Sequence, residues 1–226
     1  GYKMTQSSWD ETVKNCAYHF DTARMDQRWD NVIGLGSFKG SWDQELASTI
    51  ANSNPATWAT RGYKAEGVDI PRPDLTAEEY DLERIGMNKD AVVSHLNWDI
   101  PPVFQRMADA FAFDDPMLRI HVQMPGEVWN LHMDKLQKWC PEDPERVMRV
   151  FVQLTNWQPG HFWAFGNYTF AHWRAGDIVT MDWQNCPHCT ANAGHIPRVT
   201  LQVTGVKTDQ TIKFLAQLKN TQAYYV

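Results

Sequence analysis

The spacing of apolar residues changes near residue 118, from a helical pattern before it to a strand-like pattern after it. Before this point, helices are expected at residues 43–50, 76–85 and 103–113. The second of these is indicated by Thr76-Ala-Glu-Glu, which has the form of a capping box. Segments such as Gly34-Leu-Gly and Pro71-Arg-Pro are expected to be loops, so this region is predicted to hold helices outside any sheet.

After residue 118, polar and apolar residues alternate in short runs, so that every second side chain would face the same side of a sheet. Strands are expected at residues 119–124, 128–132, 149–155, 161–165, 168–172, 178–181 and 198–206. Residues 209–218 are expected to form a short helix. Short strands separated by Gly and Pro turns are typical of a sandwich or a jelly-roll barrel. The chain is therefore predicted to be mainly β with flanking helices.

The composition is that of a folded protein. Hydrophobic residues make up 43% of the 226 residues and charged residues 21%, which excludes a disordered chain. This length suits one large domain, or one domain with a substantial extension. The net charge of −6 provides no broad basic field for a phosphate backbone, so nucleic acid is not expected as a partner.

The four cysteines, Cys16, Cys140, Cys186 and Cys189, are too few for a disulfide scaffold in a chain of this length. Free thiols in a reducing compartment are the simpler interpretation. The sequence has no apolar run of about 18 residues that would span a membrane, and its first residues lack the apolar stretch of a signal peptide. A cytoplasmic location is expected.

A possible metal site begins with His132-Met-Asp134, at the end of the strand expected at residues 128–132. Residues two apart in a strand face the same side, so this imidazole and this carboxylate are expected to point together into the barrel. His188 follows 56 residues later, after another strand and the Pro187 turn. Two imidazoles and one carboxylate form the ligand set of non-haem iron oxygenases, which leaves coordination positions open for a co-substrate and O₂.

Arg198 lies ten residues after His188, at the start of an alternating strand in which Thr200 shares its face. A planar guanidinium binds a carboxylate through two parallel hydrogen bonds, and a neighbouring hydroxyl adds a third. This pair is expected to bind the distal carboxylate of a keto-acid such as 2-oxoglutarate.

The order H-x-D, distal His and then Arg ten residues later resembles the double-stranded β-helix oxygenases that use Fe(II) and 2-oxoglutarate. The resemblance covers residues 118–206 and is closest to the aspartyl/asparaginyl β-hydroxylase-like branch, which includes proline hydroxylases of free amino acids. The segments that carry it are Met124-Pro-Gly, His132-Met-Asp, Arg149-Val-Phe-Val-Gln-Leu-Thr-Asn, Gly176-Asp-Ile-Val, and His188 with Asn192 and Arg198.

This resemblance implies a double-stranded β-helix (jelly-roll, cupin-like) core over residues 118–207. A mixed helical and loop region, residues 1–117, would pack on it, and residues 208–226 would form a tail. The implied reaction is hydroxylation of a C–H bond in an amino acid or in a peptide or protein residue. Fe(II) would be the cofactor, 2-oxoglutarate and O₂ would be consumed, and succinate and CO₂ would be released. A carboxylate ligand at Asp134 favours hydroxylation over halogenation.

The resemblance also implies residue roles. His132, Asp134 and His188 would bind the metal, and Arg198 would anchor 2-oxoglutarate together with Thr200. Two further contacts to the co-substrate are expected from Arg149, at the start of the strand after the H-x-D segment, and from Asn130, two residues before His132.

Several alternatives remain open on the sequence alone. His195 competes with His188 as the distal ligand, and Cys186-Pro-His-Cys189 has the form of half a zinc site. Some nearby polar residues are equally compatible with ligand contacts and with structural hydrogen bonds: Gln123, Gln153, Thr155 and Asn192. Three histidines are expected to be structural or to line the pocket, His121, His161 and His172, and three tryptophans are expected to pack in the core, Trp129, Trp163 and Trp183. A metal-binding or sensing module, or a metal enzyme that does not use 2-oxoglutarate, would share the same core. The oligomeric state is not indicated.

Overall fold

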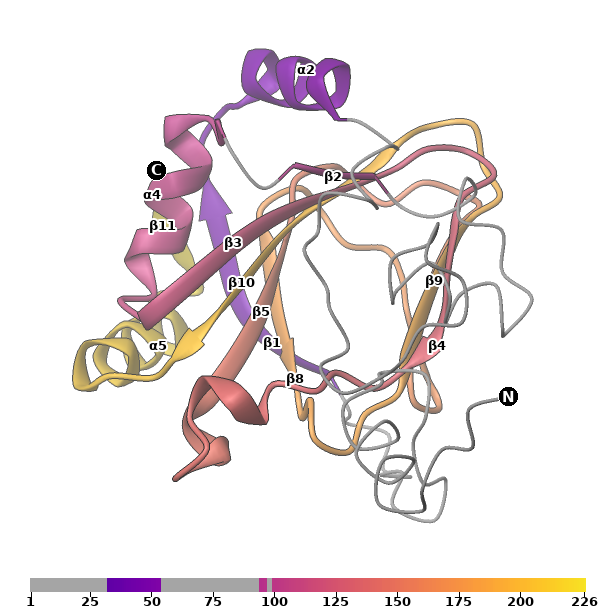
Figure 1. Ribbon diagram of the computed structural model, residues 1–226. Coiled ribbons are helices and arrows are strands. Elements are labelled where there is room, and N and C mark those ends of the chain that lie inside the picture. The colour runs from indigo at the N-terminus through magenta and orange to yellow at the C-terminus, as the bar shows by residue number, and fades with distance from the viewer. Residues whose placement is uncertain (1–31, 54–93, 97–98) are drawn as a thin grey trace, which may run out of the picture.

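The core consists of two facing β-sheets with helices on the outer side of the larger one (Figure 1). The computed structural model describes residues 32–53, 94–96 and 99–226, with residues 94–96 described by their backbone alone. The strands from residue 114 to residue 206 are β3 (Asp114–Gln123), β4 (Val128–His132), β5 (Val147–Gln153), β6 (His161–Phe165), β7 (Tyr168–Phe170), β8 (Asp177–Met181), β9 (His188–Asn192) and β10 (Arg198–Val206).

Strand order identifies the architecture. The larger sheet has the order β11-β1-β8-β5-β10-β3-β2 and the smaller sheet the order β4-β9-β6-β7. From β3 to β10, successive strands alternate between the two sheets, except at the β6–β7 hairpin, and neighbouring strands in this part are antiparallel. This winding is that of a double-stranded β-helix, so the predicted fold class is confirmed.

Strand β10 shows how the layers are organised. Its apolar residues, Val199, Leu201 and Val203, pack in the main hydrophobic core with side chains of α4 and α5. The intervening residues are polar but equally buried, and the first of them lies over the Trp163 ring of the smaller sheet. They are Arg198, Thr200, Gln202 and Thr204. On β10 the outer face is therefore apolar and the inner face polar. A second hydrophobic cluster, which includes Phe151 and Trp163, fills part of the space between the two sheets.

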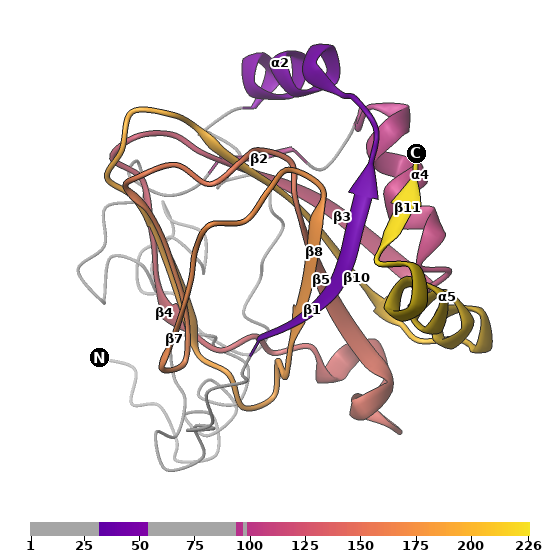
Figure 2. The same cartoon turned by 180° about the vertical axis from the view of Figure 1, so that it is seen from behind.

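Three helices confirm the helical predictions that fall on described residues: α2 (Asp43–Asn52), α4 (Pro102–Ala110) and α5 (Asp209–Thr221). Proline favours the first turn of α4, because its missing N–H would have no partner there. Thr208 caps α5 by accepting a hydrogen bond from the Thr211 amide. Figure 2 shows α4 and α5 together on the outer side of the large sheet. The helix expected at residues 76–85 lies outside the described residues.

The prediction of a loop at Gly34-Leu-Gly was wrong, because these residues belong to strand β1 (Val32–Lys39). β1 pairs with β8 on one side and with β11 (Ala223–Tyr225) on the other. The pairing with β8 shifts by one residue between Gly34 and Gly36, so the two glycines mark a bulge inside a strand rather than a turn between helices.

Other strands were missed because they are short. β11 and β2 (Ser94–Leu96) have three residues each, too few to show an alternation. β9 begins at His188, which the sequence placed after a turn. Two single turns of 3-10 helix, Gln137–Trp139 and Pro144–Arg146, form the connection between β4 and β5.

None of the described helices combines the length and the apolar character that a membrane span requires.

Gly176 allows a close approach between β1 and the loop that leads into β8. Its backbone φ is +97°, its carbonyl accepts from the Phe38 amide, and a Cβ at this position would lie 2.1 Å from the Phe38 carbonyl oxygen. We expect Gly176→Ala to lower the free energy of unfolding by roughly 2–3 kcal/mol in urea denaturation, through backbone strain and this clash.

Gly126→Ala is the matched control. Gly126 also has a positive φ, of 90°, but no atom lies within 4 Å of its would-be Cβ. Its substitution should cost about 1 kcal/mol from backbone strain alone. Equal losses in the two variants would show that the contact with Phe38 does not restrict residue 176.

Candidate metal centre

His132, Asp134 and His188 form a compact group in the barrel. One ligand atom from each residue lies within 4.8 Å of the other two, and Oδ1 of Asp134 is 3.6 Å from Nε2 of both histidines. Strands β4 and β9 bring the imidazoles together, because His132 and His188 are directly paired across them. Among the described residues this is the only such group of three or more potential metal ligands.

A bulge in β4 sets this arrangement. The pairing with β9 shifts by one residue between Trp129 and His132, so simple alternation does not continue through Asn130. Alternation was the reason for expecting the Asn130 side chain beside His132. The contact seen between them instead uses the Asn130 main-chain carbonyl, which lies 2.7 Å from Nδ1 of His132. Trp129 is the residue whose ring lies near the imidazole, with centroids 5.7 Å apart.

Backbone carbonyls fix the tautomer that each imidazole adopts when it is neutral. Nδ1 of His132 lies 2.7 Å from the Asn130 oxygen, and Nδ1 of His188 lies 3.1 Å from the Cys186 oxygen. A carbonyl oxygen only accepts, so each Nδ1 is assigned a hydrogen, and in a neutral ring Nε2 then has the lone pair. This is the second-shell arrangement that orients histidine ligands in metal sites.

The electrostatics of the group favour its metal-binding forms. Burial and the neighbouring His188 lower the pKa of His132 to about 3, so its imidazole is neutral near pH 7. Burial alone would raise the pKa of Asp134, but Arg149 and the two histidines hold it at about 2. A neutral imidazole and an ionised carboxylate are the forms that bind a divalent cation. The donor set therefore fits a first-row metal such as Fe(II), with coordination positions left open.

Arg149 contacts the carboxylate of this group. Its Nη1 lies 2.8 Å from Oδ2 of Asp134, and its Nε donates to Oγ1 of Thr204 at 2.7 Å. All three side chains are buried. The sequence placed Arg149 beside the co-substrate but gave no sign of this ion pair, since no local pattern relates residues 134, 149 and 204.

Arg198 lies at the start of β10 and is almost completely buried, with 1% of its surface exposed. Nε donates to Oε1 of Gln123 at 2.8 Å, Nη1 donates to Oγ1 of Thr200 at 2.7 Å, and the guanidinium lies 4.7 Å over the ring of Trp163. No carboxylate of the described residues pairs with it, and burial lowers its pKa to about 9. Arg198 and Thr200 thus lie side by side in the interior, as the strand alternation predicted.

Two further donors near Arg198 have no hydrogen-bond partner in the described structure, Nε2 of Gln153 and the indole Nε1 of Trp163, and both are buried. Gln153 is held by Thr200, whose hydroxyl donates to its Oε1 at 3.1 Å. An unsatisfied buried donor costs about 1–3 kcal/mol, so two of them beside an unpaired guanidinium need an explanation. The guanidinium and these two N–H donors together would suit the binding of an anion.

The loop before Arg198 is fixed by hydrogen bonds. Asn192 donates to the main-chain oxygens of Gln123 and Ile196, and Nε2 of His161 lies 2.8 Å from that same Ile196 oxygen. The other ring nitrogen of His161 accepts from the Gln158 amide. Asn192 and His161 therefore support the position of Arg198 and are not ligands themselves.

The alternative ligands lie elsewhere. His195 is exposed in the loop between β9 and β10, outside the metal group. Cys186 is buried and Cys189 partly buried, and neither belongs to a group of three potential ligands within the described part of the chain. The structure thus brings His188, and neither His195 nor the cysteines, to His132 and Asp134.

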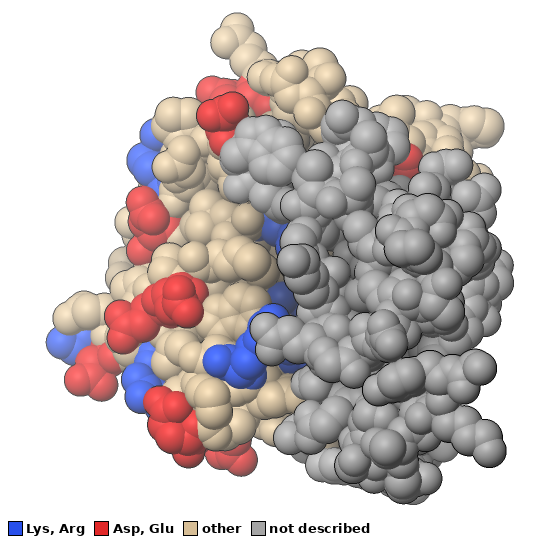
Figure 3. Space-filling view, viewed as in Figure 1, with Lys and Arg blue, Asp and Glu red and all other residues tan. Residues whose placement is uncertain are grey.

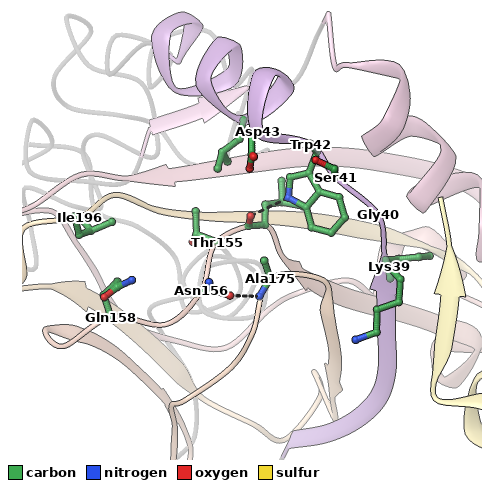
Figure 4. Close-up of a pocket in the computed structure, with 13 residues that line it drawn as sticks. Lys39, Gly40, Ser41, Trp42, Asp43, Thr155, Asn156, Gln158, Ala175 and Ile196 are labelled. Carbon is green, nitrogen blue, oxygen red and sulfur yellow. Dashed lines mark hydrogen bonds between the residues drawn. The ribbon is translucent and has the colours of Figure 1, made fainter.

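A separate cavity of about 490 Å³ lies between the start of α2 and the loop after β5 (Figure 4). Its polar groups include Thr155 and Asn156, but Asn156 already accepts from the Ala175 amide and the Trp42 indole donates to the Leu154 carbonyl. None of the metal-group residues lines this cavity.

On the face shown in Figure 3, basic and acidic side chains of the described residues are interspersed.

No protein-family model matches the sequence, and no curated protein matches it. Similar solved structures include a prolyl-4-hydroxylase from Pseudomonas putida, with 16% identity, a TM-score of 0.39 and coverage of 51% of this chain and 70% of that one. A protein described as a predicted oxalate decarboxylase from Thermotoga maritima has 15% identity, a TM-score of 0.33 and coverage of 50% and 80%. A Klebsiella pneumoniae protein with a double-stranded β-helix domain has 17% identity, a TM-score of 0.30 and coverage of 42% and 70%. At these identities the similarity concerns the fold alone.

The choice between the two distal histidines is tested by metal binding. We expect His188→Ala to weaken Mn(II) binding about 100-fold or more in anaerobic titration calorimetry, because one of three protein ligands is lost. His195→Ala should bind Mn(II) as the unchanged protein does. The reverse result, with His195→Ala impaired and His188→Ala unimpaired, would remove His188 from the metal site.

Proposed function

We propose that this protein is an Fe(II)- and 2-oxoglutarate-dependent oxygenase that hydroxylates a C–H bond of an amino acid, or of a residue in a peptide or protein. The single observation that carries the proposal is Arg198. It is a buried guanidinium with no carboxylate partner among the described residues, inside a barrel whose opposing sheet carries two of the three candidate metal ligands.

The three candidate protein ligands determine how many coordination positions of a bound metal stay open. His132, Asp134 and His188 would hold Fe(II) on one face and leave the positions that a chelating keto-acid and O₂ require. Bound iron would supply the activation of O₂ that couples oxidation of 2-oxoglutarate, to succinate and CO₂, with hydroxylation of the substrate. The protein's own contribution is to bind, to orient and to exclude water.

Orientation of the co-substrate falls to the residues around Arg198. The guanidinium and the Thr200 hydroxyl would bind the distal carboxylate, and the free donors of Gln153 and Trp163 would add hydrogen bonds. Arg198 and Gln153 are almost wholly buried, so a carboxylate here would be shielded from water and its charged hydrogen bonds strengthened.

The charge balance of the interior supports an anionic co-substrate. Apart from histidines, the buried ionisable side chains of the described residues are Arg149, Arg198 and Asp134, along with the thiols of Cys140 and Cys186. The two guanidinium groups exceed the one carboxylate before any metal binds. A divalent cation would increase this excess, and a dicarboxylate would offset it.

A second candidate function is a cupin-like metal-binding or sensing module, or a metal enzyme that does not use 2-oxoglutarate. The fold and the His132, Asp134 and His188 group favour it equally, because neither depends on the co-substrate. It leaves the buried guanidinium of Arg198 without a partner of opposite charge among the described residues, which is the reason to prefer the oxygenase.

Thermal unfolding separates these two functions. Under nitrogen, 2-oxoglutarate should raise the melting temperature of the Mn(II)-loaded protein, because a ligand that binds only the folded state stabilises it. Arg198→Gln should weaken 2-oxoglutarate binding about 100-fold, through loss of charged hydrogen bonds, while Mn(II) alone still stabilises the variant. The exposed Arg174, changed to Gln, serves as the control and should keep the full response.

Absence of any response to 2-oxoglutarate in the Mn(II)-loaded protein would reject the oxygenase and leave the metal-binding module. Where the response is present, the Fe(II) form should release succinate from 2-oxoglutarate. A panel of amino acids and peptides, analysed for products that gain one oxygen atom by mass spectrometry, would then identify the substrate.

A further inference from the structure

The two oxygens of Asp134 face different partners. Oδ1 lies 3.6 Å from Nε2 of both His132 and His188, whereas Oδ2 lies 2.8 Å from Nη1 of Arg149. The carboxylate therefore presents one oxygen to the metal group and the other to a guanidinium. We propose that Arg149 is a positioning residue that restricts Asp134 to coordination through Oδ1 alone. The inference rests on the proposed function only in that a metal binds these three residues.

The restriction matters because of the number of positions it preserves. A carboxylate that binds a metal through both oxygens takes two positions, so with two histidines it leaves two of six. Binding through Oδ1 alone leaves three, as a chelating keto-acid and O₂ together require. The ion pair of Oδ2 with Nη1 of Arg149, at 2.8 Å, opposes the rotation that would bring Oδ2 to the metal.

Arg149 is itself held firmly enough to act in this way. Its Nε donates to Oγ1 of Thr204 at 2.7 Å, and the two residues are directly paired across β5 and β10. The Thr180 hydroxyl donates to the main-chain oxygen of Arg149 at 2.7 Å. The guanidinium thus bridges a fixed hydroxyl and the carboxylate, and a lysine ammonium, which is a single point of charge, lacks the fork that bonds both.

A second effect of Arg149 opposes metal binding, because its positive charge repels a cation. Affinity alone would therefore mix two contributions of opposite sign. The number of water molecules bound directly to the metal reports the coordination by Asp134 and is independent of that repulsion. Water-proton relaxation of the Mn(II)-loaded protein measures this number.

The test compares Arg149→Gln, Arg149→Lys and Thr204→Val with the unchanged protein, all loaded with Mn(II) and without 2-oxoglutarate. We expect three bound waters in the unchanged protein and about two in Arg149→Gln. Thr204→Val keeps the guanidinium but removes its anchor, so it should fall between these values, as should Arg149→Lys. Arg146→Gln is the control, because Arg146 is exposed and bonds only the Lys207 carbonyl; it should keep three waters.

Three bound waters in all the variants would overturn the proposal, whether Mn(II) binds more tightly or more weakly. If Arg149→Gln does not fold, as judged by circular dichroism, the same decision rests on Thr204→Val and Arg149→Lys. Failure of the oxygenase proposal would be seen separately, as a protein that ignores 2-oxoglutarate but still shows the difference in bound water.

Discussion

The apolar outer face of the large sheet is the constraint on which the rest of the structure depends. Helices α4 and α5 cover this face, so the apolar residues of β10 point outward to them and its polar residues point into the barrel. A buried polar side chain is stable only where it finds partners. The polar side chains of the interior accordingly bond to one another, beside a second apolar cluster that includes Phe151 and Trp163, and the candidate chemistry of the protein lies among these polar contacts.

This polar interior has two regions with different tasks. In one, Asp134 lies between two imidazoles and a guanidinium, and its charge is matched within the protein. In the other, Arg198 is surrounded by hydrogen-bond donors and acceptors but by no opposite charge among the described residues. Charge is thus balanced in the first region by the protein itself, whereas among the described residues the second region carries an excess positive charge.

The sequence predicted what depends on local spacing. The triplet His132-Met-Asp134 and the ten-residue distance from His188 to Arg198 pointed to these residues, and alternation predicted most of the strands after residue 118. Features that depend on pairing between distant segments were not found. The contact of Arg149 with Asp134 and Thr204 requires the register of β5 and β10, and β1 was mistaken for a loop because a glycine in a bulge and a glycine in a turn look alike.

The bulge in β4 has a consequence for how such a protein could vary. One extra residue between Trp129 and His132 brings both side chains to the same face of the strand. Deletion of a single residue there would restore regular pairing and turn one of the two outward, which separates the imidazole from its partner on β9 or removes the indole beside it. Substitutions in the surrounding loops keep the number of residues in this segment, whereas a change of length by one residue moves either the imidazole or the indole away from the site.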